Sequence, residues 1–159
     1  MKVTNEKLKN YLNTKSKIFG YDVSEVDLKV SKNKILLNGI SLDVWHKLLW
    51  SWLKESNDRR KEDFFESQTF FDKKTKDLLN LTSNCFACLY CSILADLWCQ
   101  EYGVWTPACY FCPICGESDL CAKGWYSLWD RGFYPNLKKY AASKIENLKW
   151  EWKGIKNEK

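Results

Sequence analysis

The eight cysteines of this chain all fall within one short stretch, and they are the residues best suited to chemistry. Cys85-Phe-Ala-Cys88 is one Cys-x-x-Cys pair, and overlapping pairs recur further along between Cys109 and Cys121. Two such pairs separated by a loop can place four thiolates at the corners of a tetrahedron, which is the arrangement that holds a structural zinc ion. The spacing therefore predicts zinc as a structural cofactor. The eight positions are Cys85, Cys88, Cys91, Cys99, Cys109, Cys112, Cys115 and Cys121.

The second pair of zinc ligands is ambiguous. Cys112-Pro-Ile-Cys115 is followed by Gly116, which can relieve the tight backbone of a metal-binding turn. The overlapping pair of Cys109 and Cys112 has the same spacing but is followed by Pro113, which has no N–H to offer. Local geometry therefore favours Cys112 and Cys115. Cys121 can replace one of them or belong to a second site.

Other uses of these thiols predict different surroundings. Cys91 and Cys99 would lie on an apolar helix as buried free thiols. The run Cys85-x-x-Cys88-x-x-Cys91 keeps an iron–sulfur cluster open. A thioredoxin-type redox site would need a βαβ context that the chain does not suggest. A catalytic zinc usually has a histidine ligand, and the single histidine, His46, is expected in the core. We therefore expect no enzyme activity and no catalytic residues.

The N-terminal residues and the apolar runs bear on the compartment. Met1 to Lys7 leads into a polar segment without the apolar core of a signal peptide. The most apolar stretch, Phe86 to Cys99, is too short to span a bilayer and carries Asp96. These features predict a cytoplasmic protein without a membrane partner, in a reducing environment where thiolates bind metal rather than form disulfides.

The charge of the chain says little about partners. The net charge is +5, and 22 of the 25 basic residues are lysine, because Arg59, Arg60 and Arg131 are the only arginines. Arginine is the usual side chain for reading base edges, and a concentrated basic stripe is missing. Nucleic-acid binding stays possible but is not indicated by composition.

The cysteine segment must be positioned by elements on either side of it. Residues 2–19 have apolar positions that suit a short helix, and residues 26–31 and 34–40 alternate as two strands of a hairpin. Ser41 is a suitable N-cap for a helix over 42–55 with a wide apolar stripe.

The second part of the chain is expected to be mainly helical. Residues 56–77 are polar and predict a surface loop held to the core by paired phenylalanines. Helices are expected over 86–102, for one or two turns at 125–129, and over 136–152 after Pro135, with Leu137 and Tyr140 among its inward positions, whereas 103–124 is loop-rich and 153–159 is a frayed tail.

These expectations define one fold class. We predict an α+β, mainly helical fold, with a small N-terminal β-hairpin and a zinc-stapled helical C-terminal half. The chain is expected to form a single domain over 1–159. Its three parts are a helix, hairpin and Trp-rich helix over 1–55, a polar connection over 56–84, and the Cys-rich part over 85–152.

The order of these motifs resembles a cysteine-rich family encoded by bacteriophages and prophages, over roughly residues 41–152. Members typically have an aromatic helix, a polar stretch, C-x-x-C, C-x-x-C-P, a further Cys, a Tyr/Trp-rich segment and a closing helix. The matching pieces here are Leu49-Trp-Ser-Trp-Leu53, Cys85-Phe-Ala-Cys88, Cys109-Tyr-Phe-Cys112-Pro113, Cys121, Trp125-Tyr-Ser-Leu-Trp129 and Ile145-Glu-Asn-Leu148.

The resemblance implies a ligand set and a function. It selects Cys109, Cys112 and Cys121 beside the first pair, and so differs from local geometry at Cys115. Small phage proteins of this kind resemble inhibitors of host defence, including anti-CRISPR proteins. The implied partner is a host CRISPR–Cas effector such as Cas9, or another defence protein, met in the bacterial cytoplasm and blocked during nucleic-acid loading or activation.

Three aromatic residues are candidates for contact with such a partner. Tyr102, Trp105 and Tyr110 lie in or beside the expected loop, and Trp and Tyr are favoured at interaction hot spots. The alternative function is a zinc-containing, nucleic-acid-binding phage regulator, whose affinity would fall steeply with salt.

Overall fold

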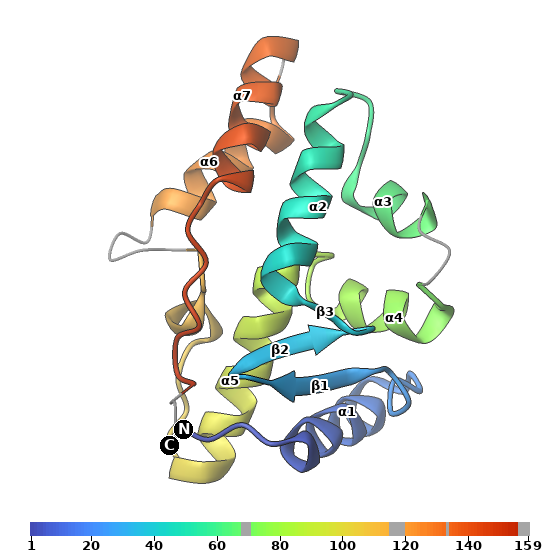
Figure 1. Ribbon diagram of the computed structural model, residues 1–159, viewed down its shortest axis with the longest axis vertical. Helices are drawn as coiled ribbons and strands as arrows, with labels where there is room; N and C mark the ends of the chain where they lie inside the picture. Colours follow the sequence, from blue (N-terminus) through green and yellow to red (C-terminus); the bar gives the residue numbers. More distant parts are fainter. Residues whose placement is uncertain (68–70, 115–119, 133, 156–159) are drawn as a thin grey trace.

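A computed structural model describes residues 1–67, 71–114, 120–132 and 134–155, and describes the helix over 120–123 without its side chains. Within these residues the chain forms seven α-helices, one 3₁₀-helix and a three-stranded antiparallel sheet (Figure 1). In chain order the elements are α1 (Asn5–Phe19), β1 (Leu28–Ser31), β2 (Lys34–Leu37), β3 (Ile40–Ser41), α2 (Leu42–Lys54), α3 (Lys61–Ser67), α4 (Lys73–Leu81), α5 (Phe86–Tyr102), η1 (Ala108–Phe111), α6 (Leu120–Asp130) and α7 (Pro135–Glu146).

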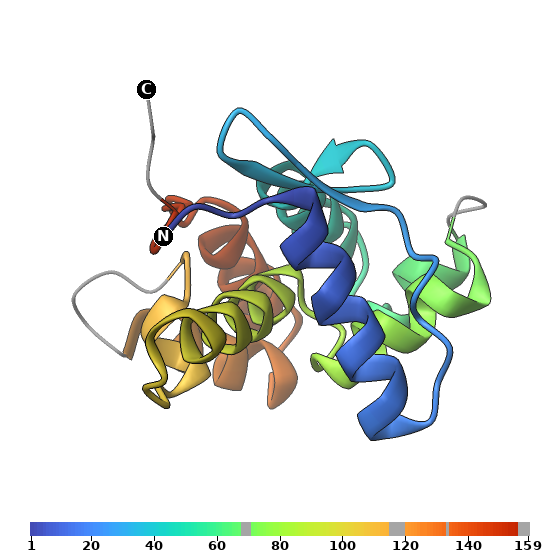
Figure 2. The same ribbon diagram turned by 90° about the horizontal axis from the view of Figure 1, so that it is seen from below.

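The N-terminal elements form as expected. The Thr4 hydroxyl caps α1 by accepting from the Lys7 N–H, and Gly20 ends the helix in the left-handed conformation. Strands β1 and β2 pair with Leu28 opposite Leu37, and β3 extends the sheet. Seen from below, α1 lies beside both the hairpin and α5 (Figure 2), and the Tyr11 hydroxyl lies 2.8 Å from that of Ser92.

Helix α2 stands at the centre of the molecule (Figure 1). It is amphipathic, and Trp45, Leu49 and Trp50 are fully buried on its inner face. Trp45 stacks on Phe86 of α5 with 5.9 Å between ring centroids, and Trp50 meets Trp129 of α6 edge to face at 5.0 Å. Aromatic pairs of this geometry add to the free energy gained by burial, so α2 joins α5 and α6.

The polar connection was expected to be a loop, but it contains α3 and α4. The aromatic anchors behave as expected, because Phe64, Phe65 and Phe71 are buried against Trp45 and Phe86. The loop prediction was wrong because the apolar positions are few and lie close together. Asp72 is the N-cap residue of α4, and its carboxylate accepts a hydrogen bond from the Thr75 N–H at 2.9 Å.

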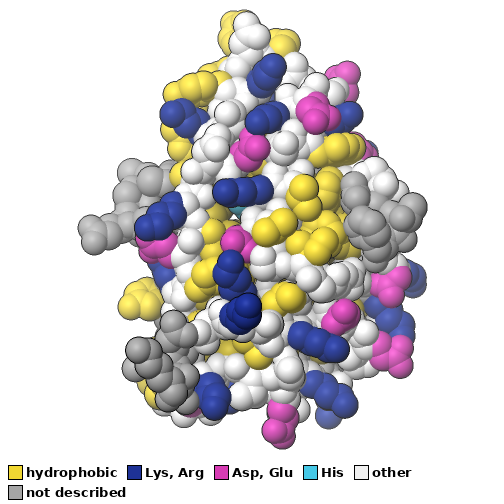
Figure 3. All heavy atoms as spheres, viewed as in Figure 1, with side chains coloured by type: hydrophobic (Ala, Val, Ile, Leu, Met, Phe, Trp, Pro, Cys, Tyr) yellow, Lys and Arg dark blue, Asp and Glu magenta, His cyan; other side chains and the backbone are white. Residues whose placement is uncertain are grey.

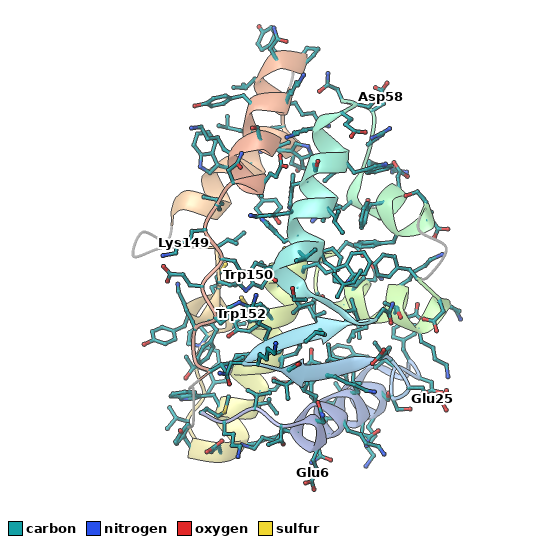
Figure 4. All side chains as sticks on the ribbon, viewed as in Figure 1. Glu6, Glu25, Asp58, Lys149, Trp150 and Trp152 are labelled. Atoms are coloured by element: carbon teal, nitrogen blue, oxygen red, sulfur yellow. The ribbon has the colours of Figure 1, made fainter. Side chains whose placement is uncertain are left out.

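The closing helix ends earlier than expected, and the residues after it are extended. Helix α7 stops at Glu146 rather than 152. Trp150 and Trp152 point from the following segment toward the interior (Figure 4), where both contact the Tyr90 ring. Alternate residues therefore face inward, and this packing, which is invisible to a helical periodicity count, overrides local propensity.

Three further expectations need correction. Helix α6 starts at Leu120, not at 125, although residues 115–119 of the predicted loop lie outside the described residues. Leu137 and Tyr140 face solvent, because α7 packs through its small residues Ala141 and Ala142 together with Ile145. The tail is not frayed at Lys153, whose carbonyl accepts from the Tyr90 hydroxyl. The α+β, mainly helical fold class is confirmed by these elements.

Candidate metal centre

The first predicted cysteine pair sits at the N-terminus of α5. Ser83 and Asn84 both adopt left-handed backbone conformations, with φ of 60° and 52°, and so turn the chain sharply between α4 and α5. Cys85 follows as the extended N-cap residue, and Cys88 lies one turn into the helix. This turn brings the Cys85 and Cys88 thiols within hydrogen-bonding reach of each other. The spacing of two residues thus places the two thiols next to each other at the start of one helix.

A second pair of thiols joins α5 to the segment after η1. Cys91 lies one turn beyond Cys88 on the same side of the helix, and its thiol interacts with that of Cys112. Cys112 follows η1 directly and packs, with Ile114, against Cys85. The 112–114 segment therefore meets the helix N-terminus, as two zinc-binding segments must. Four thiols, those of Cys85, Cys88, Cys91 and Cys112, form what we call the thiol cluster.

The backbone of the C-terminal segment holds this arrangement in place. The Glu151 N–H donates to the Pro113 carbonyl at 2.7 Å, beside the pair of Cys112 and Ile114. Leu148 and Trp150 cover the same small apolar cluster. The turn that carries Cys112 is therefore fixed by a part of the chain almost forty residues further on, which no local motif reveals.

Cys85 is buried, yet its surroundings favour the thiolate. The pKa of Cys85 is lowered to about 5, first by the hydrogen bond from the Cys88 thiol and then by the Tyr126 hydroxyl, 3.0 Å from the sulfur. The Cys88 N–H also faces this sulfur, although it makes no regular capping bond, and the charge of Lys61 acts in the same direction. These groups outweigh the burial that would raise the pKa.

The pKa values of the partner thiols shift in the opposite direction. The pKa of Cys88 is raised because its proton is held in the bond to Cys85, and burial and the charge of Cys85 add to the effect. The pKa of Cys91 is raised in the same way by its bond to Cys112. In the first pair the proton is therefore held by Cys88, and a metal ion would displace it, since metal binding to cysteine releases protons.

The capacity of the cluster for a metal rests on donor chemistry. Thiolate sulfur is the preferred ligand of structural zinc, and none of the six cysteines with described side chains forms a disulfide. Among the described residues, no group of three or more His, Cys, Asp or Glu side chains is arranged closely enough to hold a metal ion. Cys115 and the Cys121 side chain lie outside the described residues, so the predicted set with Cys112 and Cys115 extends beyond what the structure describes.

The burial of the remaining cysteines agrees with the prediction only in part. Cys109, the choice of the family order, is exposed in η1. Cys91 is buried as expected but belongs to the thiol cluster, and its spacing of i+3 from Cys88 on one helix was the signal for this. Cys99 was expected to be buried and is exposed, because it lies in the last turn of α5, beyond the covering elements.

His46 is buried beside the centre, as expected of a core residue. Its Nε2 lies 2.9 Å from the Ile145 carbonyl and so donates to it, whereas Nδ1 has no partner among the described residues. Burial is the main cause that lowers the pKa of His46, so the ring is neutral. The imidazole therefore packs α2 against α7.

A redox role for the first pair meets an obstacle in this geometry. A thioredoxin-type reaction starts from an exposed cysteine thiolate at a helix N-terminus. Cys85 has the helix position and the lowered pKa, but 2% of its surface is exposed. The buried Cys85 sulfur is therefore poorly placed to attack a disulfide substrate.

The three predicted contact residues are all exposed. Trp105 is 78% exposed, Tyr110 is 71% and Tyr102 is 48%. Gly103, in the left-handed conformation, ends α5 and directs the chain into the loop that carries Trp105. The rings of Tyr102 and Tyr110 flank the packed pair of Trp98 and Phe111. Tyr102 and Tyr110 thus lie at the two ends of one stack of rings, and Trp105 is exposed on the loop between them.

Comparisons with known proteins identify no relative. No family model, no curated protein and no solved structure matches the chain. In the described part of the chain, no single helix has both the length and the apolar character needed to cross a membrane; α4 and α5 meet the length and composition criteria only as a pair, across a bend of 74°.

Proposed function

We propose that this chain is a non-enzymatic binding protein of phage or mobile-element origin, stapled by structural zinc, that attaches to a host defence nuclease. The observation that carries the proposal is the exposed aromatic loop surface, formed by Tyr102, Val104, Trp105 and Tyr110. Large exposed apolar patches mark interaction sites, and Trp and Tyr are the side chains most enriched at hot spots.

The electrostatics of this surface favour a protein partner over a nucleic acid. No residue from Tyr102 to Cys115 carries a formal charge. The nearest carboxylate in the sequence, Glu101, is paired with Lys7 at 2.9 Å. A neutral surface gains little from phosphates but loses little when water is removed from it, as happens in the centre of a protein interface.

The zinc would fix the shape of this surface. Cys112 directly follows the 3₁₀-helix that carries Tyr110, and its turn packs on α5. Zinc on Cys85, Cys88, Cys112 and Cys115 would lock η1 to the N-terminus of α5, so that the aromatic side chains are held ready for the partner. Rigid anchors lose less entropy on binding.

The resemblance to phage cysteine-rich proteins supports the identity of the partner. It implies an anti-CRISPR type of inhibitor, with a CRISPR–Cas effector such as Cas9 as the partner. Inhibition would be by occlusion: the bound domain would block nucleic-acid loading or a conformational step of activation. No catalytic group is needed for this mechanism.

Retention of purified Cas9 on the immobilised chain, with and without guide RNA, tests the proposal. Tyr110→Ala should weaken the complex about thirtyfold, the effect of a hot-spot truncation of about 2 kcal/mol. Tyr21→Ala is the matched control, because Tyr21 is an exposed tyrosine beyond the end of α1. If neither Cas9 nor another candidate nuclease is retained, or if both variants lose binding equally, the proposal is wrong.

A further inference from the structure

Helix α7 presents a second exposed face, which differs in character from the aromatic loop surface. Its inner side packs through Ala141, Ala142 and Ile145, all buried. The outer side carries Tyr140, which is 51% exposed, and Leu137, which is 38% exposed, and Tyr134 at the N-cap is 71% exposed. We call Tyr134, Leu137, Tyr140 and Lys144, with the neighbouring Lys139, the α7 face.

This face is basic. Residues 130–146 contain four basic side chains, Arg131, Lys138, Lys139 and Lys144, against two acidic ones, Asp130 and Glu146. Glu146 is neutralised by Lys54, whose Nζ lies 2.5 Å from its carboxylate. In Figure 3 hydrophobic and basic side chains lie next to each other over the upper end of the molecule, where α7 is placed. The face therefore attracts anions.

Lysine side chains of α7 lie close to one ring of this helix and to one ring of the neighbouring α6. The Lys144 Nζ lies 5.3 Å from the centroid of the Tyr140 ring, and the Lys138 Nζ lies 4.9 Å from that of Trp129. A base that stacks on an exposed tyrosine ring therefore brings its phosphate near a lysine. Proteins that bind single strands combine these two contacts, a stacking ring and a neighbouring cation.

We propose that the α7 face binds single-stranded nucleic acid, with bases stacked on Tyr134 and Tyr140 and phosphates near Lys139 and Lys144. A duplex hides the faces of its bases and gains only the phosphate contacts. A membrane surface would need an apolar side to insert, and the apolar side of α7 is buried. The inference goes beyond the proposed function, because it requires neither zinc chemistry nor a protein partner.

Fluorescence anisotropy with a labelled oligothymidylate of about 20 nucleotides tests this site. The full chain should bind the single strand more tightly than a duplex of the same length. Raising the salt from about 50 to about 200 mM should weaken binding roughly tenfold, as expected for two or three phosphate contacts. Tyr140→Ala should raise the Kd at least about fivefold, the lower limit for loss of one stacked base. Lys144→Glu should also raise it.

Tyr21→Ala supplies the control, because it removes another half-exposed tyrosine, one outside α7. An unchanged Kd for Tyr21→Ala supports the site. The inference is overturned if the oligonucleotide does not bind at about 50 mM salt, if the duplex binds as tightly, or if Tyr21→Ala and Tyr140→Ala act equally. Binding to vesicles of anionic phospholipid without binding to the oligonucleotide would also overturn it. Because Tyr110 is not part of the α7 face, either proposal can fail without the other.

Discussion

The Cys85 sulfur has several polar neighbours within the thiol cluster and around it. The Tyr126 hydroxyl reaches it from α6, and the Cys88 thiol and N–H reach it from α5. Neighbours of this kind orient a metal ligand and tune its charge. The residues around Cys85 would therefore orient its sulfur as a metal ligand and favour its charged form.

Tyr126→Phe should weaken zinc binding without unfolding the chain. The change removes the hydroxyl that bonds to the Cys85 sulfur and leaves the ring, which packs edge to face on Trp50. Loss of such a supporting contact typically costs 10- to 100-fold in metal affinity, and we expect a loss of about that size in competition with a chelator. Tyr140→Phe, on the exposed side of α7 and outside the residues that pack on Cys85, is the control and should keep the wild-type affinity.

His46 should make stability depend on pH below its ordinary pKa. Burial lowers the pKa of His46 in the folded chain, whereas in the unfolded chain it is about 6.5. As the pH falls below 6.5, the unfolded state binds a proton at His46 that the folded state does not bind. The free energy of unfolding therefore decreases. Between about pH 7.5 and about pH 5.5 the loss should be about 1 kcal/mol in urea unfolding.

His46→Asn removes this titration and should reduce the pH dependence by that amount. The comparison uses the difference between the two pH values within each protein, so the cost of the substitution itself cancels. If the variant and the wild type lose equal stability on acidification, His46 does not contribute in this way.

The residues of the candidate site were only partly predictable. The spacing of Cys85 and Cys88 predicts one pair, and both candidates for the second pair include Cys112; the structure brings these three together. Tyr126 carries no sequence signal, because its contact with Cys85 spans 41 residues and two helices. The spacing of apolar residues shows which face of a helix is buried, but it does not show which other helix that face contacts.

At the scale of elements, the long amphipathic helices were predictable and the short polar ones were not. Helices α2 and α5 have apolar residues at helical spacing over several turns, which is a strong signal. Helices α3 and α4 have seven and nine residues, and packing of Phe64, Phe65 and Leu78 stabilises them. Isolated helices of that length are marginal, so their existence depends on tertiary contacts.

The segment after α7, which we call the strap, packs across α5 and η1. A substitution at Gly154 tests this packing. Gly154 has a φ of 81°, and a Cβ atom at this position would lie 3.1 Å from the Leu94 side chain and 3.2 Å from that of Phe111. Gly154→Ala should therefore cost about 1 kcal/mol for the left-handed backbone and a further 1–3 kcal/mol for the overpacked contact.

Gly39→Ala is a matched control for the strap. Gly39 has almost the same φ, 80°, and a Cβ there would meet nothing within 4 Å. The difference between the two variants in thermal or urea unfolding isolates the contact with Leu94 and Phe111. Equal destabilisation would mean that the strap does not pack tightly on α5 and η1.

At the scale of the whole molecule, the core and the exposed surfaces divide the aromatic residues between them. Rings such as Trp45, Trp50 and Phe86 are buried and join α2 to α5 and α6. Other rings remain exposed, among them those of the neutral aromatic loop surface beside η1 and of the basic face of α7, and Phe19 and Tyr21 at the end of α1. A chain that binds partners without catalysis needs such surfaces on a rigid support, which is the role that we assign to zinc.

The central claim is that the thiols around Cys85 hold zinc as a staple, and the metal content of the chain tests it most directly. Protein purified under reducing conditions without added metal should contain about one zinc ion per chain by elemental analysis. Cys85→Ser should lose the zinc and about 4 kcal/mol of stability, whereas Cys99→Ser, at an exposed thiol in the last turn of α5, should keep both. A wild-type chain that is folded, reduced and free of zinc would contradict the account.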